Sequence, residues 1–195
     1  MTLLMPRQLV KEASRTLVDA VALSQSPFTL SSQRQDWGGR AWQYDLEFAI
    51  HLGREGREVS AFFAMIGRAG TFLFRDPGLV TTAAGSPVVA GAGQTGTALV
   101  TSGWPANTTV LRMGDGFSIG SGSMTRLHQL TQDAISGPTG VATLIFTPAL
   151  RYAPVNGAAL EVREPCVLLR LTEPVPARFA KREIHRFNVK AMEAL

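Results

Sequence analysis

Two glycine-rich motifs are the first places in this sequence where chemistry could occur. The first, Gly91-Ala-Gly93-Gln-Thr-Gly96, fits the fingerprint of a dinucleotide-binding turn. That chemistry requires a helix beginning at the last glycine, so that the helix N-terminus faces the pyrophosphate. The residues that follow, Thr97–Pro105, are rich in strand formers and stop at a proline, which leaves no room for the helix. We therefore expect no cofactor here.

The second motif, Gly116-Phe-Ser118-Ile-Gly120, matches the nucleophile elbow of serine hydrolases. An elbow needs a helix directly after the serine, and an acid and a base later in the chain. A turn sequence follows instead. The downstream candidates are His128 and Asp133, which come in the wrong order, and then Glu183 and His185. A strand edge with a turn is the preferred interpretation and no catalytic residue is predicted. A small serine hydrolase at Ser118 is the weakest alternative.

The residues that usually bind metals or form disulfides are too few and too scattered for either role. His51, His128 and His185 stand alone, with no histidine or carboxylate beside them at metal-ligand spacing. Cys166 is the only cysteine, which excludes an internal disulfide and a cysteine-based zinc site. It lies in an apolar run and is expected to be a buried thiol. The sequence predicts no metal.

The three tryptophans are the remaining candidates for a binding role. Their rings could stack on sugars, or they could anchor the core or a subunit interface, because a large ring contributes most when it is buried. The second interpretation is the preferred one. Interface or glycan contact is therefore assigned to Trp37, Trp42 and Trp104.

The overall composition limits the class of partner. The formal net charge of +4 is scattered along the chain, without the basic stripe that nucleic-acid recognition would need. No window approaches the ~18 uncharged apolar residues of a membrane helix. No signal peptide is expected, because the apolar core that it needs would be interrupted by Lys11, Glu12, Arg15 and Asp19. We expect no membrane insertion and synthesis in a reducing cytoplasm. Charged residues are only 17% of the chain, which slightly favours an assembly that buries its surface.

The elements that would position these residues are short strands and one helix. The first part should hold a strand over 16–23, a turn at Ser26-Pro27, and a tight hairpin turn at Trp37-Gly38-Gly39. The alternation over 42–48 predicts a strand with one apolar face. A helix bearing Val59, Phe62, Phe63 and Ile66 should then end at Gly67, before a buried strand over Thr71–Phe74.

The rest of the chain predicts a small barrel or sandwich. The uncharged stretch from Thr81 to Gly96 is rich in small residues and is typical of a linker or flexible loop. Short strands separated by turn residues follow at regular spacing. They are Thr97–Thr101, Thr108–Arg112, Gly116–Ile119, Arg126–Leu130, Val141–Phe146, Ala158–Arg163, Val167–Leu171 and Ile184–Val189.

Several of these stretches resemble the distal tail proteins of long-tailed bacteriophages. SPFT, WGGRAW and GRAGTFLFRDPG are similar to the N-terminal part of that family. GAGQTGTALVTSGWPANTTVLRMGDGFSI, LHQL and GVATLIFTPALR are similar to its middle and later parts. The resemblance covers approximately residues 16–190, and its specificity comes from the order of the motifs. Residues 1–15 lie outside it.

The resemblance implies a mainly β fold. Residues 1–78 together with 165–195 would form a β-sandwich like that of tail-tube proteins, with one flanking α-helix. Residues 79–164 would form a small peripheral β-barrel, for which an OB-like barrel is one form, with a flexible loop over 79–96. Unpaired edges at Thr71–Phe74 or at the terminal strand would pair neighbouring subunits.

The resemblance also implies a structural role rather than an enzymatic one. The chain would form a homo-oligomeric ring, by family analogy a hexamer, at the tip of the virion tail. The ring would join the tail tube protein to the tip or hub protein, and DNA would cross its channel as cargo. Assembly would take place in the cytoplasm of the bacterial host. The alternative within this family is a module that binds glycans of the host surface.

Overall fold

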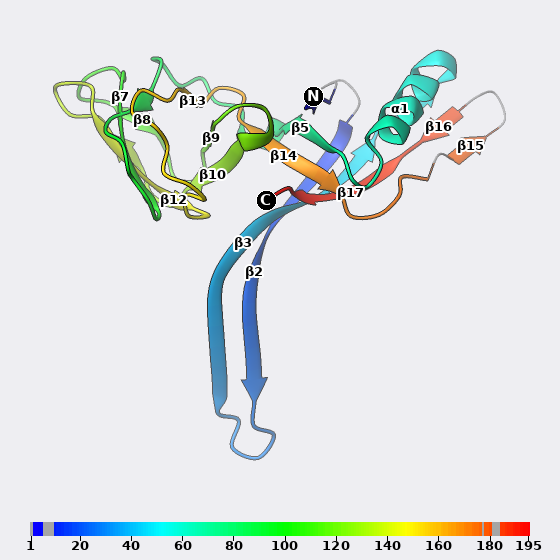
Figure 1. Cartoon of the computed structure of the whole chain (residues 1–195), viewed down its shortest axis with the longest axis horizontal. Coiled ribbons are helices and arrows are strands. Elements are labelled where there is room, and N and C mark those ends of the chain that lie inside the picture. The colour runs from blue at the N-terminus through cyan, green and yellow to red at the C-terminus, as the bar shows by residue number, and fades with distance from the viewer. Residues whose placement is uncertain (1, 6–9, 177, 181–183) are drawn as a thin grey trace.

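The computed structural model describes residues 2–5, 10–176, 178–180 and 184–195. It is mainly β with one α-helix and contains a nearly closed six-stranded barrel, which confirms the predicted fold class. The chain forms two lobes that lie side by side, and a long hairpin projects from the body (Figure 1). Strands from before residue 79 and after residue 164 build the sheet lobe, and the segment between them builds the barrel lobe.

The sheet lobe is built on a six-stranded sheet in the order β1-β5-β14-β17-β3-β2, in which only the pair β1 and β5 is parallel. A second sheet of three short strands has the order β15-β16-β4. The strands of the first sheet are β1 (Leu3–Leu4), β2 (Val10–Gln25), β3 (Ser32–Phe48), β5 (Thr71–Arg75), β14 (Cys166–Leu171) and β17 (Asn188–Glu193). Those of the second are β4 (His51–Leu52), β15 (Arg178–Ala180) and β16 (Ile184–Arg186).

The helix α1 (Gly53–Ile66) covers one face of the sheet (Figure 1). Its buried side chains recur at the predicted spacing and are Val59, Phe63 and Ile66. The Phe63 ring lies edge-on to the rings of Phe48 and Phe72, at centroid distances of 5.6 and 6.1 Å. The helix ends at Gly67, whose φ of 55° is left-handed and whose N–H donates to the Phe63 carbonyl. Both the helix and its end are confirmed.

The C-terminal segment forms two strands where the sequence predicted one. β16 pairs with β4 and β17 pairs with β3, with the buried Phe187 between them. The side chain of His185 in β16 lies so close to α1 that a Cβ added to Gly56 would come within 2.2 Å of its ring. The chain therefore passes from the small sheet to the large sheet at the buried Phe187.

The barrel lobe is a six-stranded sheet in the order β13-β9-β10-β12-β7-β6, nearly closed by a bridge between Val88 and Ala159. Its core is a separate apolar cluster that includes Leu99, Phe117, Leu144 and Phe146. The strands are β6 (Val88–Val89), β7 (Ala98–Ser102), β9 (Gly116–Ile119), β10 (Arg126–Leu130), β12 (Ala142–Thr147) and β13 (Leu160–Glu161). β8 (Thr109–Leu111) and β11 (Ala134–Ile135) form a separate pair, and single 3-10 turns lie at Pro77–Leu79 and Gly122–Met124.

The segment over 79–96, predicted to be a flexible loop, has little regular structure, but it contributes β6 to the barrel, and the Gln94 side chain bonds both the N–H and the carbonyl of Val100. One local prediction is wrong. The hairpin turn lies at 26–31, not at Trp37-Gly38-Gly39. Those glycines lie inside β3, where the register with β2 shifts and Gly38 has a φ of 70°. Paired glycines accommodate a bulge as well as a turn.

A buried carboxylate holds the hairpin strands of the sheet lobe to the end of β5, next to the start of the barrel lobe. Asp76 is 4% exposed and lies between the end of β5 and the start of the barrel lobe. It accepts hydrogen bonds from the Tyr44 hydroxyl at 2.7 Å and from the Gly78 N–H at 2.8 Å, and it pairs with the Arg15 guanidinium. Burial, and then the negative charge of Asp76, raise the pKa of Tyr44 well above its ordinary value of 10. The hydroxyl therefore stays protonated and donates.

We expect Asp76→Ala to lower the free energy of unfolding by about 3 kcal/mol, because it leaves a buried hydroxyl without an acceptor and a half-buried cation without its counter-charge. Tyr44→Phe, which removes one hydrogen bond, should cost about 1 kcal/mol. Urea unfolding monitored by tryptophan fluorescence measures both. The control is Asp19→Ala at an exposed carboxylate, with an expected change under about 0.5 kcal/mol. An Asp76 variant as stable as this control would contradict the assigned role.

Candidate assembly surface

The most unusual surface of the molecule is the distal part of the β2–β3 hairpin. β17 supports β3 only from Glu47 to Gln43, where the pairing between Met192 and Gln43 ends. The pairing of β2 with β3 continues well beyond that point, to Gln25 and Ser32. Residues 18–41 therefore form a two-stranded ribbon that we call the arm, which projects roughly 30 Å from the body at the usual rise per residue (Figure 1).

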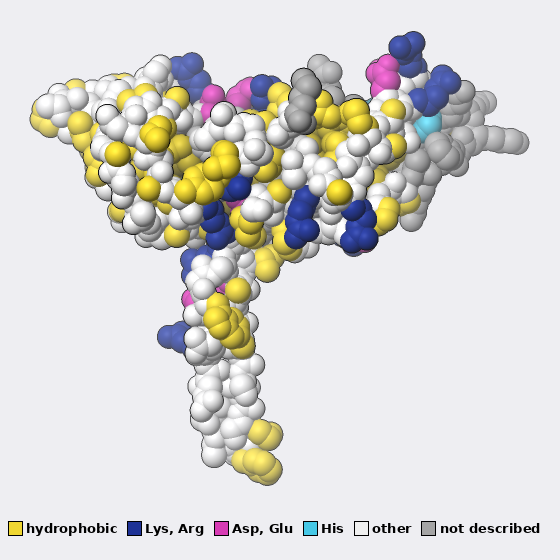
Figure 2. All heavy atoms as spheres, viewed as in Figure 1, with side chains coloured by type: hydrophobic (Ala, Val, Ile, Leu, Met, Phe, Trp, Pro, Cys, Tyr) yellow, Lys and Arg dark blue, Asp and Glu magenta, His cyan; other side chains and the backbone are white. Residues whose placement is uncertain are grey.

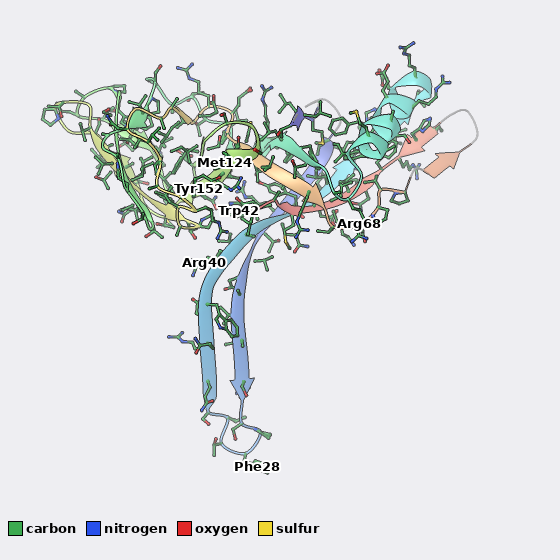
Figure 3. All side chains as sticks on the ribbon, in the orientation of Figure 1. Phe28, Arg40, Trp42, Arg68, Met124 and Tyr152 are labelled. Carbon is green, nitrogen blue, oxygen red and sulfur yellow. The ribbon has the colours of Figure 1, made fainter. Side chains whose placement is uncertain are left out.

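The arm is uncharged and apolar at its end. No charged residue occurs over 20–33. Phe28 at the tip is 94% exposed, and Leu30 beside it is 70% exposed. Leu23 and Trp37 expose further apolar surface along the ribbon. Figure 2 shows these apolar side chains against an otherwise polar ribbon, and Figure 3 shows Phe28 at the far end of the arm. Single exposed apolar side chains are common on protein surfaces, but several of them gathered on one projecting element mark a candidate interaction surface.

The tip is an ordered turn. The Leu30 N–H donates to the Ser26 carbonyl at 3.0 Å, and the Ser26 N–H donates to the Ser31 carbonyl at 2.9 Å. The Ser26 hydroxyl accepts from the Thr29 N–H at 3.3 Å. Leu30 adopts a left-handed backbone with φ of 56°, which is unfavourable for a branched side chain. The turn therefore holds Phe28 and Leu30 outward at some cost in backbone strain.

The edges expected to pair neighbouring subunits are not free. β5 lies between β1 and β14, and β17 lies between β14 and β3, so both are interior strands. The outer edge of the large sheet is β2 instead, and its register is interrupted by shifts at Val10/Glu12 and Asp19/Val21. The sequence could not distinguish interior from edge strands here, because both have the same apolar alternation.

The three tryptophans have different environments. Trp37 is 64% exposed and lies on the arm. Trp42 is buried at the base of the arm, where its indole N–H donates to the Leu127 carbonyl at 3.0 Å. Trp104 is buried in the barrel core and donates to the Thr101 hydroxyl at 2.8 Å. Only Trp37 therefore offers a ring face to a glycan or a partner. The sequence analysis did not identify Phe28 and Leu30 as exposed candidates for a contact. The uncharged stretch over 20–33, with its turn at Pro27, was the signal that could have indicated them.

An apolar groove lies on the sheet lobe between the end of α1 and the loop after β14. Its volume is about 340 Å³. Arg68 and Ser60 are the polar side chains at its rim, and Gly67 contributes backbone. Its apolar lining comes from Phe63, Ala64, Leu171, Pro174, Val175 and Phe187. The arm points away from the body, so this groove is out of reach of the tip of the same chain (Figure 1).

The residues considered for hydrolysis lie in structural positions. Ser118 is 4% exposed, and its hydroxyl accepts from the Cys166 N–H at 3.1 Å across the seam between the lobes. The imidazole of His128 bonds the Pro148 carbonyl through Nδ1 at 2.8 Å and does not contact Ser118. Gly91–Gly96 forms a loop between β6 and β7, with no helix after it.

The structure brings two histidines together that the sequence treated as isolated. His51 and His185 are cross-strand neighbours, and the His51 Nδ1 lies 3.7 Å from the Glu55 carboxylate. Within the described part of the chain, however, no group of three or more histidine, cysteine or acidic side chains could hold a metal ion.

Comparison with protein-family models and with curated proteins finds no match to this chain. In the part of the chain that the structure describes, no helix is long and apolar enough to cross a membrane.

His128 is a buried titratable group that should make the barrel sensitive to acid. Its ring stacks on Phe117 at 5.2 Å and lies edge-on to Phe146 at 4.8 Å. Burial lowers the pKa of His128 from 6.5 to about 4, although the hydrogen bond to the Pro148 carbonyl opposes this shift. Between about pH 6.5 and about pH 4 the imidazole is therefore neutral in the folded chain, while the unfolded chain binds a proton there.

We expect the folded chain to lose stability as the pH falls from about 6.5 to about 4, because the unfolded chain then binds a proton that the folded chain does not. The loss should be about 1.4 kcal/mol per pH unit and about 3 kcal/mol in all, and absent above pH 6.5. Urea unfolding at pH 7.5 and pH 5 measures it. His128→Phe should flatten this dependence whatever its effect at pH 7.5. An equally steep dependence in the variant would contradict the assignment.

Proposed function

We propose that this chain is a structural protein that assembles with copies of itself, as a ring at the distal end of a bacteriophage tail. The observation that carries the proposal is the arm, a two-stranded ribbon with an apolar tip that no described part of its own chain covers. An isolated two-stranded hairpin is marginally stable in water. An arm of this kind is supported when a neighbouring molecule packs against it.

The energy available from such packing is appreciable. Burying the side chains of Leu23, Phe28 and Leu30 would each contribute about 2 kcal/mol, or roughly 6 kcal/mol per arm. Part of this offsets the cost of bringing two molecules together. A ring closes with one such contact per subunit, so that each chain both donates and receives an arm.

The arm and its candidate seat are different surfaces of the molecule. The apolar groove beside Phe63 and Phe187 is neutral over most of its lining, like the tip that would enter it. A contact between two different surfaces is heterologous, and repetition of it about an axis produces a closed ring or a filament. Two chains could also exchange arms reciprocally about a two-fold axis, so the choice of a ring rests on the resemblance to distal tail proteins.

The resemblance of the sequence to distal tail proteins supplies the biological setting of the proposal. In that setting the ring is a hexamer, it joins the tail tube protein to the tip or hub protein, and DNA passes through its channel. The protein would reside in the virion at the tail tip, after assembly in the bacterial cytoplasm. No catalytic step belongs to this role.

We expect the purified protein to form a discrete oligomer in light scattering across a range of concentrations, with a central hole visible by negative-stain imaging. The double variant Phe28→Ser/Leu30→Ser should raise the concentration needed for assembly by at least about a hundredfold, because it removes roughly 4 kcal/mol of apolar burial per contact. Its circular dichroism spectrum should be unchanged, since both side chains are exposed.

The matched control is Val155→Ser, which alters a side chain 71% exposed on the barrel lobe and should assemble like the unmodified chain. A chain that stays monomeric at the highest concentration, and also in the presence of tail tube and tip proteins, would overturn the proposal. If the double variant formed the same oligomer at the same concentration, the proposal of self-assembly would stand, but the arm would have no part in the contact.

A further inference from the structure

The base of the arm is held by the barrel lobe at the point where the sheet no longer supports it. β17 stops pairing with β3 at Gln43, and two of the next three residues of β3, Trp42 and Arg40, are bonded by other elements. Beyond them, Gly38 and Gly39 form the bulge opposite Ala20. A two-stranded ribbon leaving a sheet next to a glycine bulge would bend readily if nothing restrained it.

Four contacts restrain it, and three come from the barrel lobe. The Arg151 guanidinium donates to the Arg40 carbonyl, and the Arg40 side chain donates to the Thr147 hydroxyl at 3.3 Å. The indole of Trp42 donates to the Leu127 carbonyl at 3.0 Å. The fourth contact comes from Glu193 of β17, whose carboxylate accepts from the Trp42 N–H at 3.2 Å in place of a strand carbonyl. Arg40 and Trp42 lie at this junction in Figure 3.

The same junction contains a buried carboxylate and two cations. Glu193 is 2% exposed, and burial raises its pKa, while the hydrogen bond from Trp42 and the cations Arg151 and Arg126 oppose that shift. Two guanidinium groups of the barrel lobe thus lie near a carboxylate of the sheet lobe. Tyr152, the residue after Arg151, is held on two sides. The Arg126 guanidinium lies 5.4 Å from the centroid of its ring, and its hydroxyl donates to the Met124 carbonyl at 2.9 Å. This second set of contacts fixes the segment that carries Arg151.

We propose that residues 147–152 of the barrel lobe are a clamp that sets the direction of the arm. The clamp makes the barrel lobe and the base of the arm move together, while without it β3 would bend over Arg40–Trp42, where β17 no longer pairs with it. The clamp therefore preorganises the arm, because an arm with a fixed direction loses less conformational entropy when it binds a partner. The clamp acts within one chain and does not depend on the proposed ring.

Pulsed electron–electron resonance between two spin labels measures the restraint. We would place labels at Ser31→Cys near the tip and Ala61→Cys on the exposed side of α1, in a Cys166→Ser background. Labelled chains would be diluted into excess unlabelled chains, so that distances between copies do not contribute whether or not the protein assembles. The unmodified clamp should give a narrow distance distribution.

Arg151→Ala should broaden this distribution about twofold and increase amide exchange at Ala41 and Arg40. Arg151→Lys should restore part of the narrowing, because an ammonium can also donate to the Arg40 carbonyl. Arg40→Ala should have a smaller effect, since it keeps that carbonyl and removes only the contact with Thr147. Arg170→Ala, at an exposed arginine of the sheet lobe, is the matched control and should leave the width unchanged.

A contribution to stability alone would lower the unfolding temperature of Arg151→Ala without widening the distribution, and that result would overturn the clamp. A distribution already broad in the unmodified chain would also overturn it. If Arg151→Ala did not fold, Arg151→Met would replace it, because it keeps the apolar part of the side chain and removes the donor to the Arg40 carbonyl. A distribution as narrow in Arg151→Met as in the Arg170→Ala control would then reject the clamp.

Discussion

The buried carboxylate of Asp76 is the interaction on which the arrangement of the molecule depends. It lies between the two lobes and receives donors from both strands of the hairpin, Arg15 on β2 and Tyr44 on β3. The Arg15 guanidinium also lies over the Trp42 ring at 5.2 Å. One group therefore fixes the base of the arm to the segment that follows β5, directly before the barrel lobe. Removing either donor would leave the buried Asp76 carboxylate with one partner fewer, and this cost favours the observed geometry over others.

From that joint outward, the support of β3 changes in three stages. Over Gln43–Glu47 the strand lies inside a sheet, over Arg40–Trp42 it is held by the barrel lobe and Glu193, and beyond the bulge only β2 remains. The order of these stages explains why the arm projects from the seam between the lobes. The sheet lobe alone would restrain the base of the ribbon only through β2 and Glu193. The barrel lobe adds the hydrogen bonds with Arg151, Thr147 and Leu127.

Local patterns predicted the elements better than their partners. The alternation over 42–48 correctly predicted a strand with Trp42, Tyr44, Leu46 and Phe48 buried, and helical spacing correctly predicted α1 up to Gly67. The glycines at 38–39 were assigned to a turn because a bulge and a turn need the same backbone freedom. The pairing of His51 with His185, and the interior positions of β5 and β17, depend on contacts between distant segments that a single sequence does not encode in any local pattern.

The features of the arm favour contact through its tip over contact through its edges. A free strand edge invites another strand, but the shifts at Val10/Glu12 and Asp19/Val21 break the hydrogen-bond register of β2, and such irregularities discourage pairing along its length. The tip has the opposite character, because its N–H groups are bonded within the turn and its apolar side chains are exposed. The absence of charge over 20–33 removes the desolvation cost that a charged tip would bear on burial. An arm that resists strand addition but keeps an apolar end can select a shaped apolar seat, and that selectivity favours a defined assembly over aggregation.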